Sequence, residues 1–384
     1  MINYGKQQII KKDIDSVVKT LKSNFLTTGP ATLRFEESLK KKIKSKYALS
    51  CSSGTAAIHL SLLAIGIKKN DVIIMPVINF VASANLVSIL GAKIIFSDVN
   101  QLTGQMTPKD LLNCIKKNNL RKIKAVITMY NGGDPLNAKE FYKIKKKYGF
   151  FLIEDSCHAL GSKYYTSGKH YIGSCKFSDI STFSFHPVKS ITTCEGGLIT
   201  TNKKFVYDKI KILRNHGMVK KKKKNYVWDY KIVYPGLNYR LSDVSSALGH
   251  SQLKRLDKII NDRKKIAQLY VKKLISFNEY INLPNVVKSN SSFHLFIINF
   301  NLKKLKINRD KIIQILYEKK IKTQVHYIPI SNHPYYKKNL NFKLPESEKY
   351  FLSCLSLPIY PGLTKRQINY VCLNLEKIIK KYKK

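Results

Sequence analysis

The stretch Ser184-Phe-His-Pro-Val-Lys189-Ser-Ile-Thr-Thr-Cys-Glu-Gly-Gly197 decides the fold of this chain. An apolar run, Ile180–Phe185, leads into it and predicts a buried strand. Lys189 follows in a turn of small and apolar residues, and two glycines that permit close backbone approach open the next strand. A lysine in a partly desolvated site loses proton affinity and becomes a nucleophile. A solvated loop lysine is the ordinary alternative in a chain this rich in lysine.

A second segment, Phe151-Leu-Ile-Glu-Asp155-Ser-Cys-His158-Ala-Leu-Gly161, is an apolar strand that ends in a carboxylate. Ligand crevices form at the carboxyl ends of parallel strands. An acid at such an end can keep a pyridine nitrogen protonated, which makes the ring an electron sink. Capping of the following turn is the alternative role for Asp155.

Two further segments add an anion site and an aromatic ring. Ser52-Ser-Gly54-Thr55-Ala-Ala is a small-residue turn that opens an apolar helix, where free N–H groups and the helix dipole suit a phosphate. A plain helix cap is the alternative. Phe80 follows the buried run Val72–Met75 and can stack on a ring, although core packing is the commoner fate of phenylalanine. One ring cofactor needs all four groups: phosphate turn, aromatic, aspartate and lysine.

Apolar runs alternate with amphipathic stretches over the first two thirds of the chain. The expected strands are Val72–Met75, Ile94–Phe96, Ala125–Met129, Phe150–Ile153 and Ile180–Phe185. The expected helices between them are Ala82–Leu90, Pro108–Asn118 and Asn137–Tyr148. This alternation predicts an α/β fold with a largely parallel sheet covered on both faces.

The last third predicts a second, smaller α+β domain. A long helix over Ser242–Lys273 is expected to lead into it, so we divide the chain into a large domain, 1–250, and a small domain, 251–384. The remaining expected elements are strands at Phe293–Phe300, Thr323–Ile328 and Cys354–Leu357, a helix at Arg309–Lys319, and a closing helix from Thr364.

Composition limits the compartment and the partners. The net charge of +45 would suit a nucleic-acid binder, but the excess is almost all lysine, as an AT-rich coding bias produces, and arginine is scarce. The seven cysteines are scattered without a CxxC pair, which predicts free thiols in a reducing cytoplasm and no metal site. The uncharged stretch 72–92 contains a proline and several polar residues, so a buried strand and helix explain it better than a membrane span. We therefore expect a cytoplasmic protein that binds neither nucleic acid nor membrane.

Together these motifs resemble the DegT/StrS family of nucleotide-sugar aminotransferases, which use pyridoxal 5'-phosphate (PLP) and have PLP fold type I. The resemblance runs nearly end to end, and its most specific pieces are SFHPVK with EGG, EDSCHALGS, SSGTAA, RNHGM at 214–218 and GLNYRLSDVSSALG at 236–249. Two places depart from the family: Cys194 stands where glycine or alanine is common, and the segment Tyr130–Pro135 is one residue longer than usual.

The resemblance implies a role for each site residue. The expected ring-binding residues are Lys189 as the Schiff-base lysine, Asp155 at the pyridine nitrogen, His158 beside the ring and Phe80 on its face. The expected phosphate-binding residues are Gly54, Thr55, Ser184 and, from the neighbouring subunit of a homodimer with shared sites, Asn238. The expected lining of the sugar-nucleotide pocket is Tyr4, Asn24, Phe25, Leu26, Thr27, Gln324, Val325, His326 and Tyr327.

The activity that the resemblance implies is transfer of an amino group, with L-glutamate as the donor, to C-4 of a UDP-linked 4-keto-6-deoxy-N-acetylhexosamine, a step of pseudaminic acid biosynthesis. Another nucleotide-linked keto sugar is the nearest alternative. A related sugar dehydratase would have histidine in place of Lys189. A regulatory or nucleic-acid-binding protein with an inert fold is the alternative from another class, and the intact set of Lys189, Asp155 and Gly54 argues against it.

Overall fold

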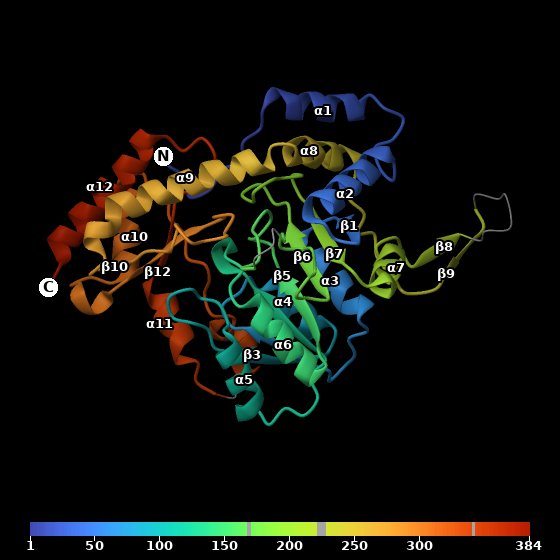
Figure 1. The fold of residues 1–384 in the computed structure, drawn as a ribbon, viewed down its shortest axis with the longest axis horizontal. Helices are drawn as coiled ribbons and strands as arrows, with labels where there is room; N and C mark the ends of the chain where they lie inside the picture. The colour runs from blue at the N-terminus through green and yellow to red at the C-terminus, as the bar shows by residue number, and fades with distance from the viewer. Residues whose placement is uncertain (167–169, 221–227, 340–341) are drawn as a thin grey trace.

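The fold is known from a computed structural model, which describes residues 1–166, 170–220, 228–339 and 342–384 (Figure 1). The helices are α1 (Lys11–Leu21), α2 (Pro30–Ile43), α3 (Gly54–Ala64), α4 (Ala82–Ile89), α5 (Pro108–Lys117), α6 (Ala138–Tyr148), α7 (Lys204–Leu213), α8 (Asp243–Leu253), α9 (Leu256–Leu274), α10 (Arg309–Glu318), α11 (Pro345–Ser353) and α12 (Lys365–Tyr382). The main strands are β1 (Tyr47–Cys51), β2 (Val72–Pro76), β3 (Lys93–Ser97), β4 (Ala125–Met129), β5 (Phe151–Asp155), β6 (Ile180–Ser184) and β7 (Gly197–Thr201). The shorter strands are β8 (Met218–Lys220), β9 (Tyr230–Ile232), β10 (Ile281–Asn282), β11 (Phe296–Phe300) and β12 (Cys354–Leu357).

A seven-stranded sheet with the order β1-β7-β6-β5-β4-β2-β3 forms the centre of the molecule. The pairs among β3, β2, β4, β5 and β6 are parallel, and β7 runs antiparallel to both of its neighbours, β6 and β1. The prediction of a mostly parallel sheet covered by helices is confirmed. Because β6 and β7 are adjacent and antiparallel, the segment between them, which holds Lys189, turns back at the carboxyl end of β6.

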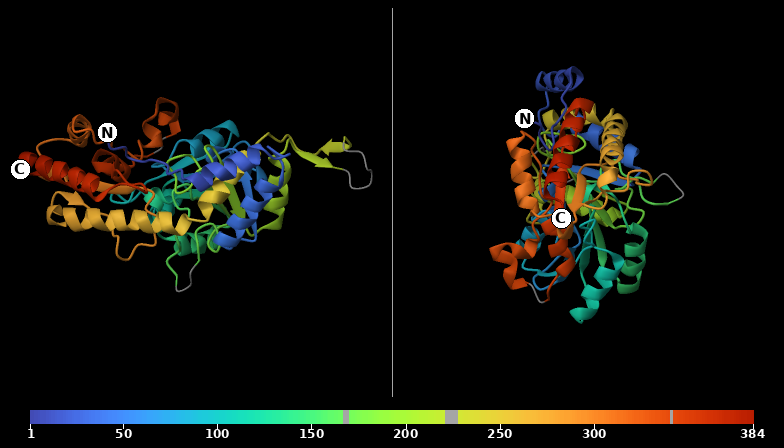
Figure 2. Two further views of the ribbon diagram at one scale, coloured as in Figure 1. Left: turned by 90° about the horizontal axis from the view of Figure 1, so that it is seen from above. Right: turned by 90° about the vertical axis from the view of Figure 1, so that its left-hand side faces the viewer.

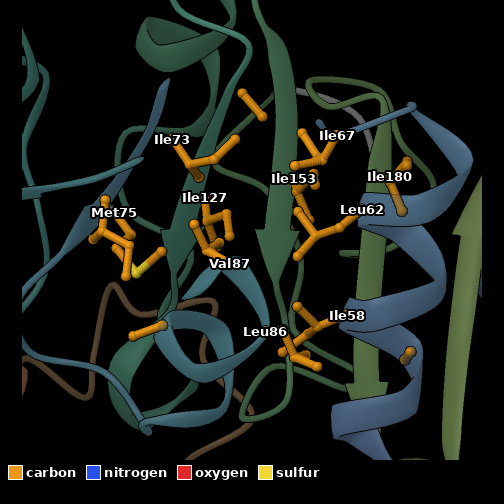
Figure 3. Close-up of a cluster of buried hydrophobic side chains, with 14 of the residues drawn as sticks. Ile58, Leu62, Ile67, Ile73, Met75, Leu86, Val87, Ile127, Ile153 and Ile180 are labelled. Carbon is orange, nitrogen blue, oxygen red and sulfur yellow. The ribbon is translucent and has the colours of Figure 1, made fainter. Parts of the chain in front are cut away.

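Helices cover both faces of this sheet, as the apolar runs predict. On one face, residues of α3, α4 and α7 pack against Ile73, Met75 and their neighbours, and Figure 3 shows Ile58 and Leu62 of α3 among them. Ile74, which lies between Ile73 and Met75 in β2, points to the other face, where it meets residues of α5 and α6. Strands buried on both faces leave only their ends for ligands.

A second core lies in the C-terminal part of the chain. The three-stranded sheet β10-β11-β12 packs with residues of α9, α10 and α12, and Ile2 from the N-terminal end joins this cluster. Figure 1 shows these elements at the end of the molecule opposite the β8–β9 hairpin. The proposed division of the chain at residue 250 lies inside α8 and stays a prediction.

Two expected elements are wrong in detail. The helix over Ser242–Lys273 is two helices, α8 and α9, with a turn at Lys254 and Arg255. There the Arg255 guanidinium reaches the buried carboxylate of Asp13 at 2.6 Å, so a tertiary ion pair accompanies the break.

The segment Thr323–Ile328 does not form a strand, because after an isolated bridge between Gln324 and Ser356 its polar groups take other partners. The Nδ1 atom of His326 lies 2.8 Å from the hydroxyl of Ser356, and the His326 carbonyl accepts a hydrogen bond from Tyr350 at 2.8 Å.

The expectations for the cysteines and for the uncharged stretch agree with the structure. All seven cysteines are free. The stretch 72–92 forms β2, a turn and α4. In the ranges that the structure describes, none of the helices combines the length and the apolar character that crossing a membrane requires. The cytoplasmic location stays a prediction.

Candidate active site

The chemical groups picked out in the sequence gather at the carboxyl ends of neighbouring strands. Asp155 is the last residue of β5 and Ser184 the last of β6, while Gly54 begins α3 shortly after β1 ends. Phe80 follows β2, and Lys189 lies in the turn between β6 and β7. In a parallel sheet these ends share one edge, so segments far apart in the sequence build one crevice.

The turn before α3 fits a phosphate closely. A Cβ atom on Gly54 would lie 2.9 Å from the Cβ of Ser184, so only glycine lets the turn approach this serine. Ser53 caps the helix by accepting from the Ala56 N–H at 3.0 Å, and Thr55 is exposed. The remaining N–H groups and the helix dipole can hold an anion beside the Ser184 hydroxyl.

Asn238 is exposed, in the loop before α8. The next residue, Tyr239, accepts a backbone hydrogen bond from Ser52 at 2.9 Å. The loop therefore lies beside the phosphate turn of its own chain. The contribution of Asn238 to a neighbouring subunit's site stays a prediction.

Asp155 is a buried carboxyl group with little internal support. The backbone N–H of Cys157 donates to its Oδ1 at 3.2 Å. Burial raises the pKa of Asp155, and the Cys157 thiol, the Lys189 charge and the Asn79 amide oppose this rise. In the part of the chain that the structure describes, Asp155 takes part in no ion pair. A protonated ring nitrogen would supply the missing positive partner, so this residue fits the cofactor.

Lys189 is placed to react as a free amine. Its side chain is half-buried, and burial lowers its pKa, with a smaller effect in the same direction from the nearby Arg263 guanidinium. Asp155 and Cys157 act in the opposite sense. The turn between β6 and β7 that contains Lys189, the lysine turn, is held by its own backbone, since the Lys189 N–H donates to the His186 carbonyl at 2.9 Å. A lysine whose pKa falls is a better nucleophile and proton acceptor at neutral pH.

Phe80 offers an aromatic face to the same crevice. It is 55% exposed, although it lies between a buried strand and α4. Its ring centroid is 6.0 Å from that of Tyr327, and the two rings are tilted. A planar cofactor ring stacked on Phe80 would cover this apolar surface. The exposed ring therefore also fits PLP.

Part of the expected sugar pocket reaches this crevice. The Tyr327 hydroxyl lies 3.0 Å from Nε2 of the buried His158. The ring of Tyr4 lies 5.9 Å from that of His326, between centroids. Gln324 and Val325 directly precede His326 and Tyr327 in the chain and are more exposed than His326.

The other part of the expected pocket lies elsewhere in this chain. Residues 24–27 are all exposed. The Leu26 carbonyl accepts from the Asp243 N–H at 2.9 Å, so this segment runs beside the start of α8. Among the contacts of the described residues, none joins residues 24–27 to Lys189 or Phe80. Their role in sugar binding stays a prediction.

Two groups beside the site escaped the sequence analysis. Arg263 of α9 is almost completely buried, and its guanidinium donates to the carbonyls of Ile359 at 2.9 Å, His294 at 3.1 Å and Val188 at 3.4 Å. It thereby ties the lysine turn to the C-terminal part of the chain. An arginine in a chain that otherwise uses lysine was the available signal. Asn79, buried beside Asp155, offered no signal beyond its place next to Phe80.

Comparison with known proteins identifies the family of this chain. The model of the DegT/DnrJ/EryC1/StrS aminotransferase family matches residues 7–376. The chain is 37% identical, over 100% of its length and 99% of the relative's, to the UDP-4-amino-4,6-dideoxy-N-acetyl-beta-L-altrosamine transaminase of Campylobacter jejuni strain 81-176.

Solved structures show the same fold. The Helicobacter pylori aminotransferase PseC, described as involved in the biosynthesis of pseudoaminic acid, superposes with a TM-score of 0.90 at 30% identity, over 99% of both chains. The PLP form of the sugar aminotransferase Spr1654 from Streptococcus pneumoniae superposes with a TM-score of 0.89 at 28% identity, again over 99% of both chains. The chain therefore belongs to the DegT/DnrJ/EryC1/StrS aminotransferase family and is a PLP-dependent sugar aminotransferase.

Proposed function

We propose that this enzyme transfers the amino group of L-glutamate to C-4 of a UDP-linked 4-keto-6-deoxy-N-acetylhexosamine and so forms UDP-4-amino-4,6-dideoxy-N-acetyl-β-L-altrosamine for pseudaminic acid biosynthesis. The observation that carries this proposal is the end-to-end likeness, at 37% identity, to a Campylobacter jejuni transaminase with that product in its name. The meeting of Tyr327 with the buried His158 beside the lysine turn supports it, because a polar substrate needs positioned hydroxyl and imidazole groups.

Lys189 and Asp155 carry the chemistry in this proposal. When bound, PLP supplies an electron sink for the negative charge that develops at the carbon losing a proton. With PLP bound, the Lys189 amine would hold the cofactor, and it would act as the base and acid that moves a proton away from the α-carbon of the amino acid. Its lowered pKa favours the neutral amine that this task needs. Asp155 would pair with the ring nitrogen of bound PLP and keep that nitrogen protonated.

The remaining residues bind and orient. The turn at Gly54 and Thr55, with the Ser184 hydroxyl, holds the phosphate end, and Phe80 holds the ring face. Tyr4 and the segment 324–327 line the sugar side. Residues that hold a rigid ring at both ends would keep its reactive carbon within reach of Lys189. Holding reacting groups in the right geometry is one of the main ways in which an enzyme lowers the activation barrier.

The test is a direct assay of products. Purified protein with PLP and L-glutamate is incubated with a panel of UDP- and dTDP-linked 4-keto sugars, and the products are read by mass and by NMR. We expect one amino sugar from the UDP-linked 4-keto-6-deoxy-N-acetylhexosamine, and none from the Lys189→Ala control. Efficient conversion of a different nucleotide sugar alone would replace this substrate with another of the same class.

We also propose a homodimer with shared active sites. The β8–β9 hairpin extends away from the body of the molecule (Figures 1 and 2) and exposes large apolar side chains such as Tyr230 and Ile232. An arm with apolar residues exposed to water is costly for a monomer and typical of a surface that a second copy covers. Asn238 follows this hairpin in the chain, which supports a role across a two-fold interface.

A mixed dimer tests the shared site. One subunit carries Lys189→Ala and the other Asn238→Glu, a change that places negative charge beside the phosphate. If the sites are shared, one site of the mixed dimer carries both lesions and the other carries none, so activity partly returns. Subunit exchange without any recovery, or an active monomer, would refute the arrangement.

A further inference from the structure

The segment that departs from the family, Tyr130–Pro135, lies against the most buried imidazole of the site. Residues Asn131–Gly133 form a tight turn in which Gly132 has φ 75°, a left-handed conformation that favours glycine. This brings the Gly132 N–H to Nδ1 of His158 at 3.3 Å. A Cβ atom on Gly133 would lie 2.5 Å from the His158 carbonyl oxygen, so both glycines are needed for the approach.

This contact fixes where His158 carries its proton. A backbone N–H can only donate, so Nδ1 is the unprotonated nitrogen and the neutral ring has its proton on Nε2. Nε2 faces the Tyr327 hydroxyl oxygen at 3.0 Å, so His158 donates and the Tyr327 oxygen accepts. Burial also lowers the pKa of His158 well below its usual range, with Lys189 and His326 acting in the same direction, which agrees with a neutral ring.

The direction of the next hydrogen bond follows from this one. Burial raises the pKa of Tyr327, so the hydroxyl keeps its proton. That proton cannot point at His158, whose own Nε2 proton occupies the line between them. It is left for an acceptor elsewhere in the crevice, which the Phe80 ring also borders, with its centroid 6.0 Å from that of Tyr327.

The turn Asn131–Gly133 also holds Tyr327, the hydrogen-bond partner of His158. The Asn131 amide donates to the Tyr350 hydroxyl at 2.7 Å, and Tyr350 donates to the carbonyl of His326, the residue before Tyr327, at 2.8 Å. One three-residue turn therefore holds His158 through its ring and Tyr327 through its backbone neighbour. Both contacts are buried, where an unmade hydrogen bond is costly, so the pair has little freedom to reverse.

We propose that Tyr327 is the fixed hydrogen-bond donor of the crevice to an oxygen that gains negative charge during the reaction, and that His158 and the turn Asn131–Gly133 are positioning residues that set this direction. The oxygen is either the hydroxyl oxygen attached to the cofactor ring or the keto oxygen of the sugar. The inference rests on the proposed function only for the second of these. A preorganised donor aimed at developing charge is worth about 10² in rate.

An isosteric pair of variants at His158 tests the direction of donation. In His158→Gln the side-chain oxygen can accept from Gly132 while the amide donates to Tyr327, so the direction is kept. In His158→Glu both oxygens accept, so Tyr327 turns its proton toward the glutamate. We expect His158→Gln to retain at least about a tenth of the wild-type rate, and His158→Glu and Tyr327→Phe each to lose about 10²-fold.

A double-mutant comparison separates the direction of the Tyr327 hydrogen bond from the effect of the charge that glutamate introduces at 158. In the Tyr327→Phe background there is no hydroxyl to reverse, so exchanging glutamine for glutamate at 158 should change the rate by less than about threefold. An equal gap between the two variants in both backgrounds would overturn the assigned direction. Tyr327→Phe buries no new charge, and it remains the deciding variant if His158→Glu fails to fold.

Measurements without sugar identify the oxygen. If the acceptor is on the cofactor, Tyr327→Phe shifts the absorption of bound PLP and its pH dependence, and slows the half-reaction with L-glutamate. If the acceptor is the keto oxygen, these two stay at wild type and only the sugar half-reaction slows. Wild-type values for the absorption and both half-reactions would overturn the inference. Should the wild type convert none of the sugars, the proposed substrate fails. A shifted absorption or a slower glutamate half-reaction in Tyr327→Phe then still supports the inference, with the cofactor oxygen as the acceptor, and wild-type values for both would overturn the assignment to the cofactor.

Discussion

Two neighbouring carboxyl groups on β5 differ in what surrounds them. Glu154 and Asp155 are both buried, and burial raises the pKa of each. Because side chains alternate along a strand, the two point to opposite faces of the sheet. Asp155 faces the lysine turn, where the Lys189 charge lowers its pKa, and Glu154 faces a cluster of hydroxyl groups.

Glu154 is saturated with internal partners. It accepts from Tyr130 at 2.6 Å, from Tyr164 at 2.8 Å, from Ser178 at 2.9 Å and from Ser181. Among the described residues Asp155 has fewer donors: the Cys157 backbone N–H at 3.2 Å, and the Cys157 thiol and the Asn79 amide, which also lower its pKa. A carboxyl group whose lone pairs are filled by its own chain serves the fold, and one with acceptor capacity left serves a ligand. Burial alone does not distinguish them.

The largest expected effect comes from Lys189, in the lysine turn that Asp155 of β5 faces. Lys189→Ala should reduce turnover by about 10⁴-fold, because it removes the amine that moves the proton. It should also abolish the absorption of lysine-bound PLP, and borohydride reduction of wild type followed by peptide mapping should label Lys189. The exposed Lys19→Ala is the matched control and should behave as wild type. Labelling of another lysine would reject the assignment.

Asp155→Asn should give the next largest loss, about 10³-fold in kcat. A neutral amide cannot keep the ring nitrogen protonated, so the electron sink weakens although shape is preserved. Cofactor binding and the thermal unfolding midpoint should stay near wild type, which equilibrium dialysis and calorimetry would measure. Near-normal turnover would remove Asp155 from the mechanism.

Glu154→Leu should show the reverse pattern. It leaves four buried hydroxyl groups without their acceptor, which should lower the free energy of unfolding by about 3 kcal/mol or more. The kcat of the folded enzyme should stay within about threefold of wild type, since Glu154 faces away from Lys189. Chemical denaturation with parallel assays measures both. A large loss of kcat in a fully folded variant would show that the two faces of β5 are not separate.

The smallest expected effect is a difference in pH dependence between wild type and Glu154→Gln. A carboxyl group whose folded pKa is raised binds its proton more tightly when folded. Its contribution to stability is therefore present at low pH and declines as pH rises from its ordinary value of 4.5 through the folded pKa. Denaturation curves from pH 4 to 8 should show the stability of wild type, relative to the variant, falling as pH increases. A relative stability that rises would mean that the hydroxyl groups hold Glu154 as an anion.

The sequence predicted what is encoded locally. Asp155, Ser184, Gly54 and Lys189 each stand at the junction of a strand with a turn, and such junctions carry composition signals within a few residues. The parallel strands were found for the same reason. The pairing of β1 with β7 was not, because both strands are short and the partner of each is set by register over a long separation.

The network around Tyr327 was also beyond sequence reasoning. Asn131 and Tyr350 are 219 residues apart, and His158 and Tyr327 are 169 apart, so no window of sequence contains either pair. The expected strand at Thr323–Ile328 failed on the same account. A strand there would pair its backbone in a ladder, but the polar groups of His326 are bonded to Ser356 and Tyr350 instead. Arg263 was missed because a charged residue on an amphipathic helix is expected to be solvated.

The backbone at Cys194 is left-handed, with φ 66°, a conformation that favours glycine, and its exposed thiol lies five residues beyond Lys189. The other cysteines are buried or half-buried, and burial raises the pKa of the half-buried Cys157 well above its usual range, which makes it a poor nucleophile. A thiol-reactive fluorophore would therefore attach preferentially at Cys194. The enzyme thus carries its own attachment point for an optical reporter of events in the lysine turn, with no engineered residue.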